Sequence, residues 1–180
     1  ADFEVIPVIN SARARQLVLG KKINPALNIR FGTVSDCRNI SMLLATAFAE
    51  FKTVYTPKAF EATTVTAAGI ESRMKEGPVW VAQLEDEIVG TVSVLSKGMH
   101  LYIRGMGVHP RARGMKVGFN LLKTVEEYAK TKQFEGLILS TTPYLKRAIA
   151  LYEKFGFRIV NHPPFYLYKT PLMTMVKDLK

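Results

Sequence analysis

The sequence predicts a three-layer α+β domain built on a mixed β-sheet. Residues 79–108 contain three consecutive strand-like segments joined by short turns, which is the pattern of an antiparallel meander. Residues 101–140 then alternate strand, helix and strand, a unit whose two strands lie parallel in one sheet. At 180 residues, 48% of them hydrophobic and 22% charged, the chain is long and apolar enough for one folded core. A purely parallel, doubly wound sheet is therefore not expected.

Before the meander, the pattern predicts one strand and two helices. The strand covers residues 28–34, and Ser35 is the predicted N-cap of the helix that follows. Thr56 and Pro57 suit the cap and first position of a second helix, which runs to about Met74 and ends at Gly77-Pro78. The first helix has its apolar residues in helical phase: Ile40, Leu43, Leu44, Ala47, Phe48 and Phe51.

The meander consists of predicted strands at residues 79–84, 88–96 and 101–108. An acidic turn over residues 85–87 joins the first two strands, and Lys97-Gly98 joins the second to the third. Glycine at 105 and 107, inside the third strand, indicates a β-bulge or a close approach of a ligand to the backbone.

The second half continues with a helix over residues 114–130, a strand over 137–140 and a helix over 144–155. Thr142-Pro143 is the predicted start of this last helix, and Gly156 is suited to its left-handed C-terminal cap. Residues 157–160 and 166–176 form a predicted closing pair of strands. Further upstream, residues 3–9 could form a strand and residues 12–19 a short helix.

The net charge of +10 is concentrated in one third of the chain. Residues 97–158 hold 12 Lys or Arg against 4 Asp or Glu, and the remainder holds 13 against 11. A positive field of this kind favours a polyanionic ligand, although a solvated basic face has the same composition. The single Cys37 excludes an internal disulfide, and no apolar run approaches the length of a bilayer span. With no signal peptide visible, we expect a cytoplasmic protein without a membrane partner.

The basic stretch at residues 108–118 is the best candidate for binding an anion. A predicted strand leads into a loop with two glycines, and an amphipathic helix follows directly. The backbone N–H groups at the start of a helix, together with the helix dipole, favour phosphate. Arg113 and Lys116 add positive charge at the same place.

Other phosphate, metal and nucleophile motifs fail on spacing. Gly105 and Gly107 begin like a dinucleotide fingerprint, but Pro110 stands where the third glycine is required, and no Gly-Lys-Ser/Thr sequence exists. Three scattered histidines and one cysteine lack the spacing of metal ligands, and no Ser-His-Asp set is visible. No basic groove interleaved with aromatic residues suggests a nucleic-acid partner.

Two segments resemble the motifs of a known superfamily. Val108-x-Pro110-x-x-Arg113-Gly114-x-Lys116-Val117-Gly118 resembles motif A of the GNAT N-acetyltransferases, and residues 147–157 resemble motif B. The resemblance covers residues 28–180 and leaves residues 1–27 as an N-terminal extension of unknown role. It implies an acetyl-CoA-dependent N-acetyltransferase with a mostly antiparallel sheet of about six or seven strands and one splayed parallel pair.

The resemblance also implies roles for particular residues. The pantetheine arm would lie along Met106, Gly107 and Val108, with an N–H near Met106 polarising the thioester carbonyl. Tyr152 would act as the general acid, although packing in an apolar helix face is the simpler explanation of a tyrosine there. The pyrophosphate would lie on N–H groups of Arg113, Gly114, Met115, Lys116, Val117 and Gly118. The family usually has glycine or alanine where this chain has Lys116, and often asparagine where it has Leu145.

The base and the acceptor are less well determined by the sequence. His100 has the most suitable ordinary pKa and is the leading candidate base, with Glu50 and His162 as alternatives. The acceptor is expected to be a primary amine of a small molecule or peptide that attacks acetyl-CoA directly in a ternary complex. The alternative is a catalytically silent acyl-CoA-binding regulatory module on the same fold. A homodimer could form through the N-terminal segment or the final strand, and the sequence does not decide this.

Overall fold

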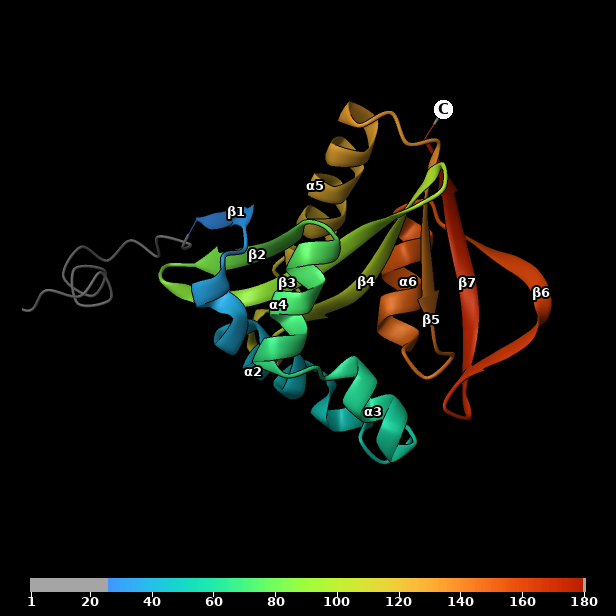
Figure 1. The fold of residues 1–180 in the computed structure, drawn as a ribbon, viewed down its shortest axis with the longest axis horizontal. Coiled ribbons are helices and arrows are strands. Elements are labelled where there is room, and N and C mark those ends of the chain that lie inside the picture. Colours follow the sequence, from blue (N-terminus) through green and yellow to red (C-terminus); the bar gives the residue numbers. More distant parts are fainter. Residues whose placement is uncertain (1–25, 180) are drawn as a thin grey trace, which may run out of the picture.

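The computed structural model describes residues 26–179 and shows one seven-stranded mixed sheet with helices on both faces (Figure 1). The strand and helix predicted at residues 3–9 and 12–19 lie outside the described residues. The strands are β1 (Leu27–Phe31), β2 (Val79–Leu84), β3 (Glu87–Lys97), β4 (His100–Val108), β5 (Gly136–Thr141), β6 (Arg158–Leu167) and β7 (Thr170–Asp178). The helices are α2 (Cys37–Phe48), α3 (Pro57–Thr63), α4 (Ala67–Glu76), α5 (Val117–Thr131) and α6 (Lys146–Lys154), with short 3-10 turns η1 (Val34–Asp36), η2 (Ala49–Phe51) and η3 (Pro110–Ala112).

The order of strands across the sheet is β1-β2-β3-β4-β5-β7-β6. Strands β2, β3 and β4 form the predicted antiparallel meander. Strands β4 and β5 are parallel and are connected through α5, as the strand–helix–strand pattern predicts. All other neighbours are antiparallel. The predicted mixed sheet with one parallel pair is thus confirmed.

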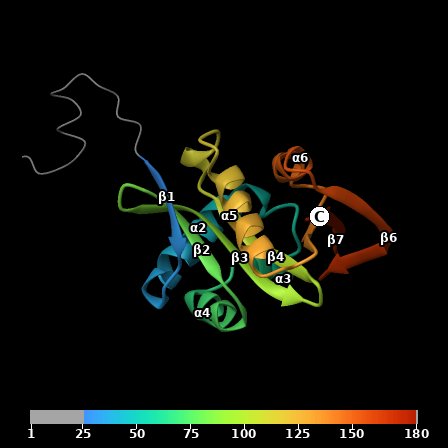
Figure 2. The ribbon, with the colours of Figure 1, turned by 90° about the horizontal axis from the view of Figure 1, so that it is seen from above.

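Two apolar cores, one on each face of the sheet, make the structure three-layered. On one face α2 and α4 pack on β2 through a cluster of buried side chains: Cys37, Ile40, Leu44, Ile70, Val79 and Val81. On the other face α5 and α6 cover a larger cluster that includes Leu121, Leu122, Leu137, Leu139 and Met175. Figure 2 shows α4 and α5 on opposite sides of the sheet. None of the helices described here combines the length and apolar character that crossing a lipid bilayer requires.

The glycines of β4 produce the bulge that the sequence predicts. Arg104 pairs with Ser93 and Gly107 pairs with Thr91, so two residues of β4 stand opposite one residue of β3. Gly105 is the first of those two, with a left-handed φ of 57° that an L side chain rarely adopts. The bulge lies where β4 approaches the end of its contact with β5.

Strands β4 and β5 part after four paired residues. The parallel ladder joins residues 100–103 to residues 136–139 and stops at the pair Ile103 and Leu139. Beyond this pair β4 continues to Val108, while β5 ends at Thr141 and stays paired with β7 along its whole length (Figure 1). Among residues 26–179, the edge of β4 over residues 104–108 therefore has no strand beside it on the β5 side.

Three predicted helix boundaries are wrong, each for a local reason. The single helix expected over residues 57–74 is two helices, α3 and α4, because Thr66 caps α4 by accepting from the Gly69 N–H. The helix expected from Gly114 begins at Val117, since the loop before it contains left-handed residues. Thr142-Pro143 does not cap α6, whose N-cap is Leu145.

The closing strand pair is also longer and differently divided than predicted. Strand β6 runs from Arg158 to Leu167, and a turn at Tyr168 and Lys169, both with positive φ, leads into β7. The pairing is interrupted between Val160 and Phe165, where β6 bows away from β7 (Figure 1). The sequence predicted a closing strand pair but not the position of its turn, because the turn contains neither glycine nor asparagine, the residues that usually supply positive φ.

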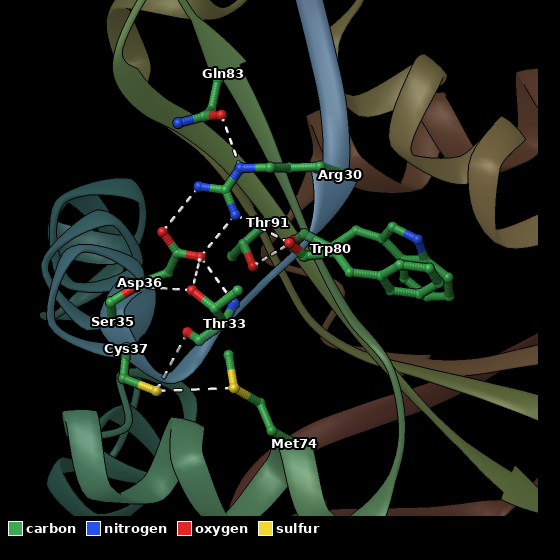
Figure 3. Close-up of polar contacts among 10 residues, drawn as sticks. Arg30, Thr33, Ser35, Asp36, Cys37, Met74, Trp80, Gln83 and Thr91 are labelled. Carbon is green, nitrogen blue, oxygen red and sulfur yellow. Dashed lines mark hydrogen bonds and ion pairs between the residues drawn. The ribbon is translucent and has the colours of Figure 1, made fainter.

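A partly buried ion pair between Arg30 and Asp36 links β1 to the start of α2 (Figure 3). Arg30 donates to both carboxylate oxygens of Asp36, at 2.7 and 2.9 Å, and also to the side chain of Gln83. Asp36 in turn accepts from the N–H and hydroxyl of Thr33, in a capping box that replaces the predicted Ser35 cap. The Arg30 hydrogen bonds hold the pKa of Asp36 well below its usual range, against the opposing effect of burial.

We expect Asp36→Asn to lower the free energy of unfolding at pH 7 by about 2 kcal/mol, because a partly buried guanidinium and the Thr33 donors lose their anionic acceptor. An aspartate with a lowered folded-state pKa stabilises the fold above its unfolded-state pKa of about 3.9, and this contribution is lost as the pH falls towards the folded-state value. The difference between the two proteins should therefore shrink below about pH 4. Urea unfolding at several pH values checks this, with Asp86→Asn in the exposed β2–β3 turn as the control. A difference independent of pH would contradict the assignment.

Candidate active site

A cleft of about 600 Å³ opens where β4 parts from β5. Its walls come from the end of β4, the loop and first turn of α5, one face of α6, and the end of α2 with η2. Of the residues predicted to hold the cofactor, eight line the cleft: Met106, Gly107, Val108, Arg113, Gly114, Lys116, Val117 and Gly118. Met115 does not line it, and 43% of this residue's surface is exposed. The structure thus brings together nearly all of the predicted binding segment.

The β4 wall offers free backbone edge to a ligand. Gly107 and Val108 still pair with Thr91 and Gly90 of β3 on one side. On the β5 side, the ladder has already ended at Ile103. An extended ligand with amide groups can therefore pair with this edge as an additional strand would.

The loop between β4 and α5 supplies unpaired N–H groups. The N–H groups of Arg113 and Met115 donate to carbonyls within the loop. Across residues 26–179 the N–H groups of Gly114 and Lys116 have no backbone acceptor. The first-turn N–H groups of α5, from Val117 onwards, have no acceptor within the helix by its geometry. The free donors are fewer than predicted, and together with the helix dipole they suit a phosphate group.

The backbone at Lys116 explains why glycine would suit this position. Lys116 is the N-cap of α5 and has φ 60° and ψ 14°, in the left-handed region. For a residue with a Cβ, this conformation costs about 1 kcal/mol or more of free energy. Gly114 is also left-handed, and a Cβ on Gly118 would lie 2.8 Å from a methyl of Leu151. The close packing of α5 against α6 therefore depends on the absence of a side chain at Gly118.

Arg113 connects the loop to the opposite wall of the cleft. Its Nη2 donates to the carbonyl oxygen of Ala47 at 3.2 Å and lies 2.5 Å from Oε1 of Glu50. The second oxygen of Glu50 lies 4.0 Å from Nη1 of Arg147 on α6. One carboxylate thus lies between two guanidinium groups that come from different walls, which ties the end of α2 to the loop.

Tyr152 lies at the inner part of the cleft. Only 8% of its surface is exposed, and its hydroxyl points at Met106, 4.0 Å from Sδ. Burial, with a smaller effect from the nearby Tyr55, raises the pKa of Tyr152 to about 12. The hydroxyl therefore keeps its proton at neutral pH and can donate a hydrogen bond beside the free edge of β4.

The three candidate bases lie in different places. His100 is the first residue of β4, pairs with Gly136 and is not on the wall of the cleft. His162 lies in the interrupted part of β6, where its ring nitrogens contact the Pro163 carbonyl and the Thr174 hydroxyl. Glu50 lines the cleft. The structure therefore does not bring His100 or His162 to Tyr152.

The structure adds residues to the site that the sequence did not indicate. Phe119, in the first turn of α5, lines the cleft and packs edge-on against Phe155 with ring centroids 5.3 Å apart. It lies off the apolar stripe of α5, and that isolated position was the signal available in the sequence. Leu145, where the family often has asparagine, also lines the cleft and makes no side-chain cap to α6.

Solved acetyltransferases share this fold. A paia N-acetyltransferase from Thermoplasma acidophilum, solved in complex with coenzyme A, has a TM-score of 0.74 at 13% identity, over 85% of this chain and 99% of that one. The acetyltransferase yncA from Salmonella typhimurium, solved with acetyl-CoA, has a TM-score of 0.66 at 20% identity, over 86% of this chain and 95% of that one. At these identities the likeness establishes the fold, which is that of the GNAT acetyltransferases.

The sequence comparisons establish the family. The model of the acetyltransferase (GNAT) family matches residues 42–157, and the chain belongs to this family. An IAA acetyltransferase from Azospirillum brasilense is 35% identical over 79 residues, 44% of this chain and 50% of that protein. The probable N-acetyltransferase camello from Xenopus laevis is 29% identical over 102 residues, 54% of this chain and 47% of that protein. The matched stretches span about half of these relatives. The resemblance predicted from the two motifs is confirmed.

We expect Lys116→Gly to raise the free energy of unfolding by about 1 kcal/mol, because glycine adopts the left-handed N-cap conformation without strain. For a chain of this size, the melting temperature should rise by about 2–4 °C. Lys123→Gly, in the middle of α5, is the matched control and should cost about 1 kcal/mol. Thermal unfolding of both variants distinguishes the cases, and destabilisation by both would show that Lys116 makes contacts that outweigh its backbone strain.

Proposed function

We propose that the protein moves the acetyl group of acetyl-CoA to a primary amine of a small molecule or peptide by direct attack in a ternary complex. The observation that carries this proposal is the cleft itself. It combines a free strand edge, unpaired N–H groups at the start of α5 and the Tyr152 hydroxyl in one continuous wall. Membership of the GNAT family supports acyl-CoA as the donor.

The chain's own residues fit the parts of this cofactor. The β4 edge over Met106, Gly107 and Val108 would pair with the amides of the pantetheine arm. The N–H groups of Gly114, Lys116 and the first turn of α5 would hold the pyrophosphate. Arg113 would add charge there through the part of its guanidinium that does not face Glu50. Bound in this way, acetyl-CoA supplies an activated acetyl thioester.

Two groups near Met106 would stabilise charge during transfer. A backbone N–H of β4 near Met106 would donate to the carbonyl oxygen, where negative charge develops. Tyr152 holds its proton at Oη and would donate towards the leaving sulfur as the general acid. Because the raised pKa of Tyr152 exceeds that of an ordinary thiol, about 8.5, the hydroxyl would stabilise the leaving thiolate chiefly as a hydrogen-bond donor.

The amine must lose a proton before it attacks, which requires a base or a water relay. Among the three candidate bases Glu50 is the one that lines the cleft, so we now prefer it to His100. Its carboxylate is engaged by Arg113 and lies close to Arg147, so a role in positioning the loop competes with a role in proton transfer.

Tyr152→Phe should leave acetyl-CoA binding unchanged and lower kcat by about 100-fold or more, because it removes the proton donor without removing the ring. Calorimetry with tens of micromolar protein measures binding, and release of free CoA thiol across amines, amino acids, aminoglycosides and peptides measures turnover. No binding with excess acetyl-CoA would rule out the proposed function. Binding without thiol release from any acceptor, and with no effect of Tyr152→Phe, would instead identify a silent acyl-CoA-binding module.

Glu50→Gln separates the two roles of this carboxylate. As a base, Glu50 contributes to kcat, and the variant should lose about 100-fold in kcat. As a positioning group, it acts through Arg113, and the variant should change the acetyl-CoA Kd with kcat retained. Glu61→Gln on α3 is the control. An unchanged kcat would eliminate Glu50 as the base.

A further inference from the structure

Two arginine side chains lie together under α4, on the face of the sheet opposite α5. Arg73 comes from α4 and Arg104 from β4, immediately before the bulge at Gly105. Arg73 lies so close over the bulge that a Cβ on Gly105 would collide with its Nη1. Burial lowers the pKa of Arg73, and the positive charge of Arg104 lowers it further, so the two cations are close enough to repel.

The two arginines have more positive charge than nearby negative charge, and several of their hydrogen-bond donors lack an acceptor. Within residues 26–179, the Nη1 of Arg73 and the Nε and Nη2 of Arg104 are buried atoms without a hydrogen-bond partner. Arg73 Nη2 donates to the Ala62 carbonyl at 3.3 Å. Glu76 lies 2.7 Å from Arg104 Nη2 as an ion pair without hydrogen-bond alignment. Two cations therefore share one carboxylate, which is an unusually costly arrangement for buried donors.

The pair lies next to the reacting end of the cleft. Neither arginine lines the cleft, and Met106, which lines it and faces Tyr152, follows Arg104 by two residues along β4, with the bulge at Gly105 between them. The β4–β5 ladder ends at Ile103, so no strand separates residues 104–106 from the cleft on that side. The donors without partners are themselves buried, and 22% of the Arg104 side chain is exposed, so a small ligand would enter from the exposed side of Arg104.

We propose that Arg73 and Arg104 bind a carboxylate of the acceptor, so that the substrate is a small amine that carries an acid group, such as a free amino acid. This inference rests on the proposed acetyltransferase function and specifies its substrate class. A carboxylate accepts two parallel hydrogen bonds from a guanidinium, which matches the unused donors of these two side chains. The short distance to Met106 allows the amine of the same molecule to reach the free β4 edge.

A purely structural role for the pair makes a different prediction. Arg73 also links α3, through Ala62, to the bulge of β4. If this link were its whole purpose, replacing Arg73 would lower stability and all rates equally, without regard to the charge of the acceptor. A comparison of acceptors that differ in a carboxylate alone therefore separates binding from structure.

The experiment measures kcat/KM with acetyl-CoA for amino acids and for their amides, which keep the amine and lack the acid group. Wild-type protein is compared with Arg73→Gln, Arg104→Gln and Arg104→Lys, and with Arg38→Gln on the exposed surface of α2 as the control for loss of one charge. The acid-to-amide ratio in each variant, divided by that of wild type, cancels the different basicity of the two amines. Circular dichroism and Trp80 fluorescence check folding.

We expect the acid-to-amide ratio to fall by about 10- to 100-fold in Arg104→Gln and Arg73→Gln, the loss expected for a charge-assisted hydrogen-bonded pair. The ratio should be unchanged in Arg38→Gln and partly retained in Arg104→Lys, while the Kd for acetyl-CoA stays the same in all variants. Equal ratios in wild type and the glutamine variants would overturn the inference, as would turnover of other amines without any of amino acids. Loss of acetyl-CoA binding in wild type would overturn the proposed function as well.

Discussion

The parting of β4 from β5 is the constraint on which the rest of this structure depends. Two parallel strands that remained paired along their whole length would satisfy each other's backbone groups and leave no cleft. Here the ladder stops at Ile103, two residues before the bulge at Gly105, whereas β5 stays paired with β7 along its whole length. The free edge of β4 is stable because β3 holds its other side and because α5 and α2 pack against its two faces. The free edge of β4, with which an extended ligand could pair, thus follows from ordinary strand pairing and a single β-bulge.

The loop after β4 adds N–H donors and positive charge beside this edge. Positive φ at Gly114 and Lys116 turns the chain sharply, so that α5 begins with its N–H groups towards the cleft. Gly118 lets α5 approach Leu151 on α6, and that contact brings Tyr152 to Met106. Lys116 is the one strained member of this turn. Its position suggests that a positive charge at the mouth of the cleft compensates for the backbone cost, since the same residue adds to the field that attracts a polyanion.

Charged side chains form two groups around the site that differ in how far their positive charge is neutralised. At the loop, Glu50 lies between Arg113 and Arg147, so those cations are partly neutralised and the two walls of the cleft are joined. Under α4, Arg73 and Arg104 share Glu76 and keep unused donors beside the reacting end. The first arrangement is a structural tie across the mouth. The second arrangement, Arg73 and Arg104 with one carboxylate between them, has excess positive charge that the carboxylate of an acidic acceptor would neutralise.

Local sequence patterns determined the parts of this protein that depend on local chemistry. The period-two and helical repeats predicted the meander, the parallel β4–β5 pair and the fold class. The spacing of Arg113, Gly114 and Gly118 predicted a loop that leads into a helix, because turn glycines and helix starts are properties of a few adjacent residues. The local patterns did not predict the break at Thr64–Thr66, which a Thr66 cap produces, or the turn at Tyr168-Lys169, which adopts positive φ without glycine or asparagine.

Only the tertiary structure decided which distant side chains meet. His100 has suitable chemistry and lies at the wrong end of β4, whereas Glu50 comes to the cleft from η2, more than fifty residues before the loop. Arg73 and Arg104 are unremarkable surface-type residues in the chain, and become a pair because α4 packs over the β4 bulge. Sequence spacing describes neighbours along one element. Burial, charge balance and unsatisfied donors are properties of several elements packed together, and they become visible only in the folded chain.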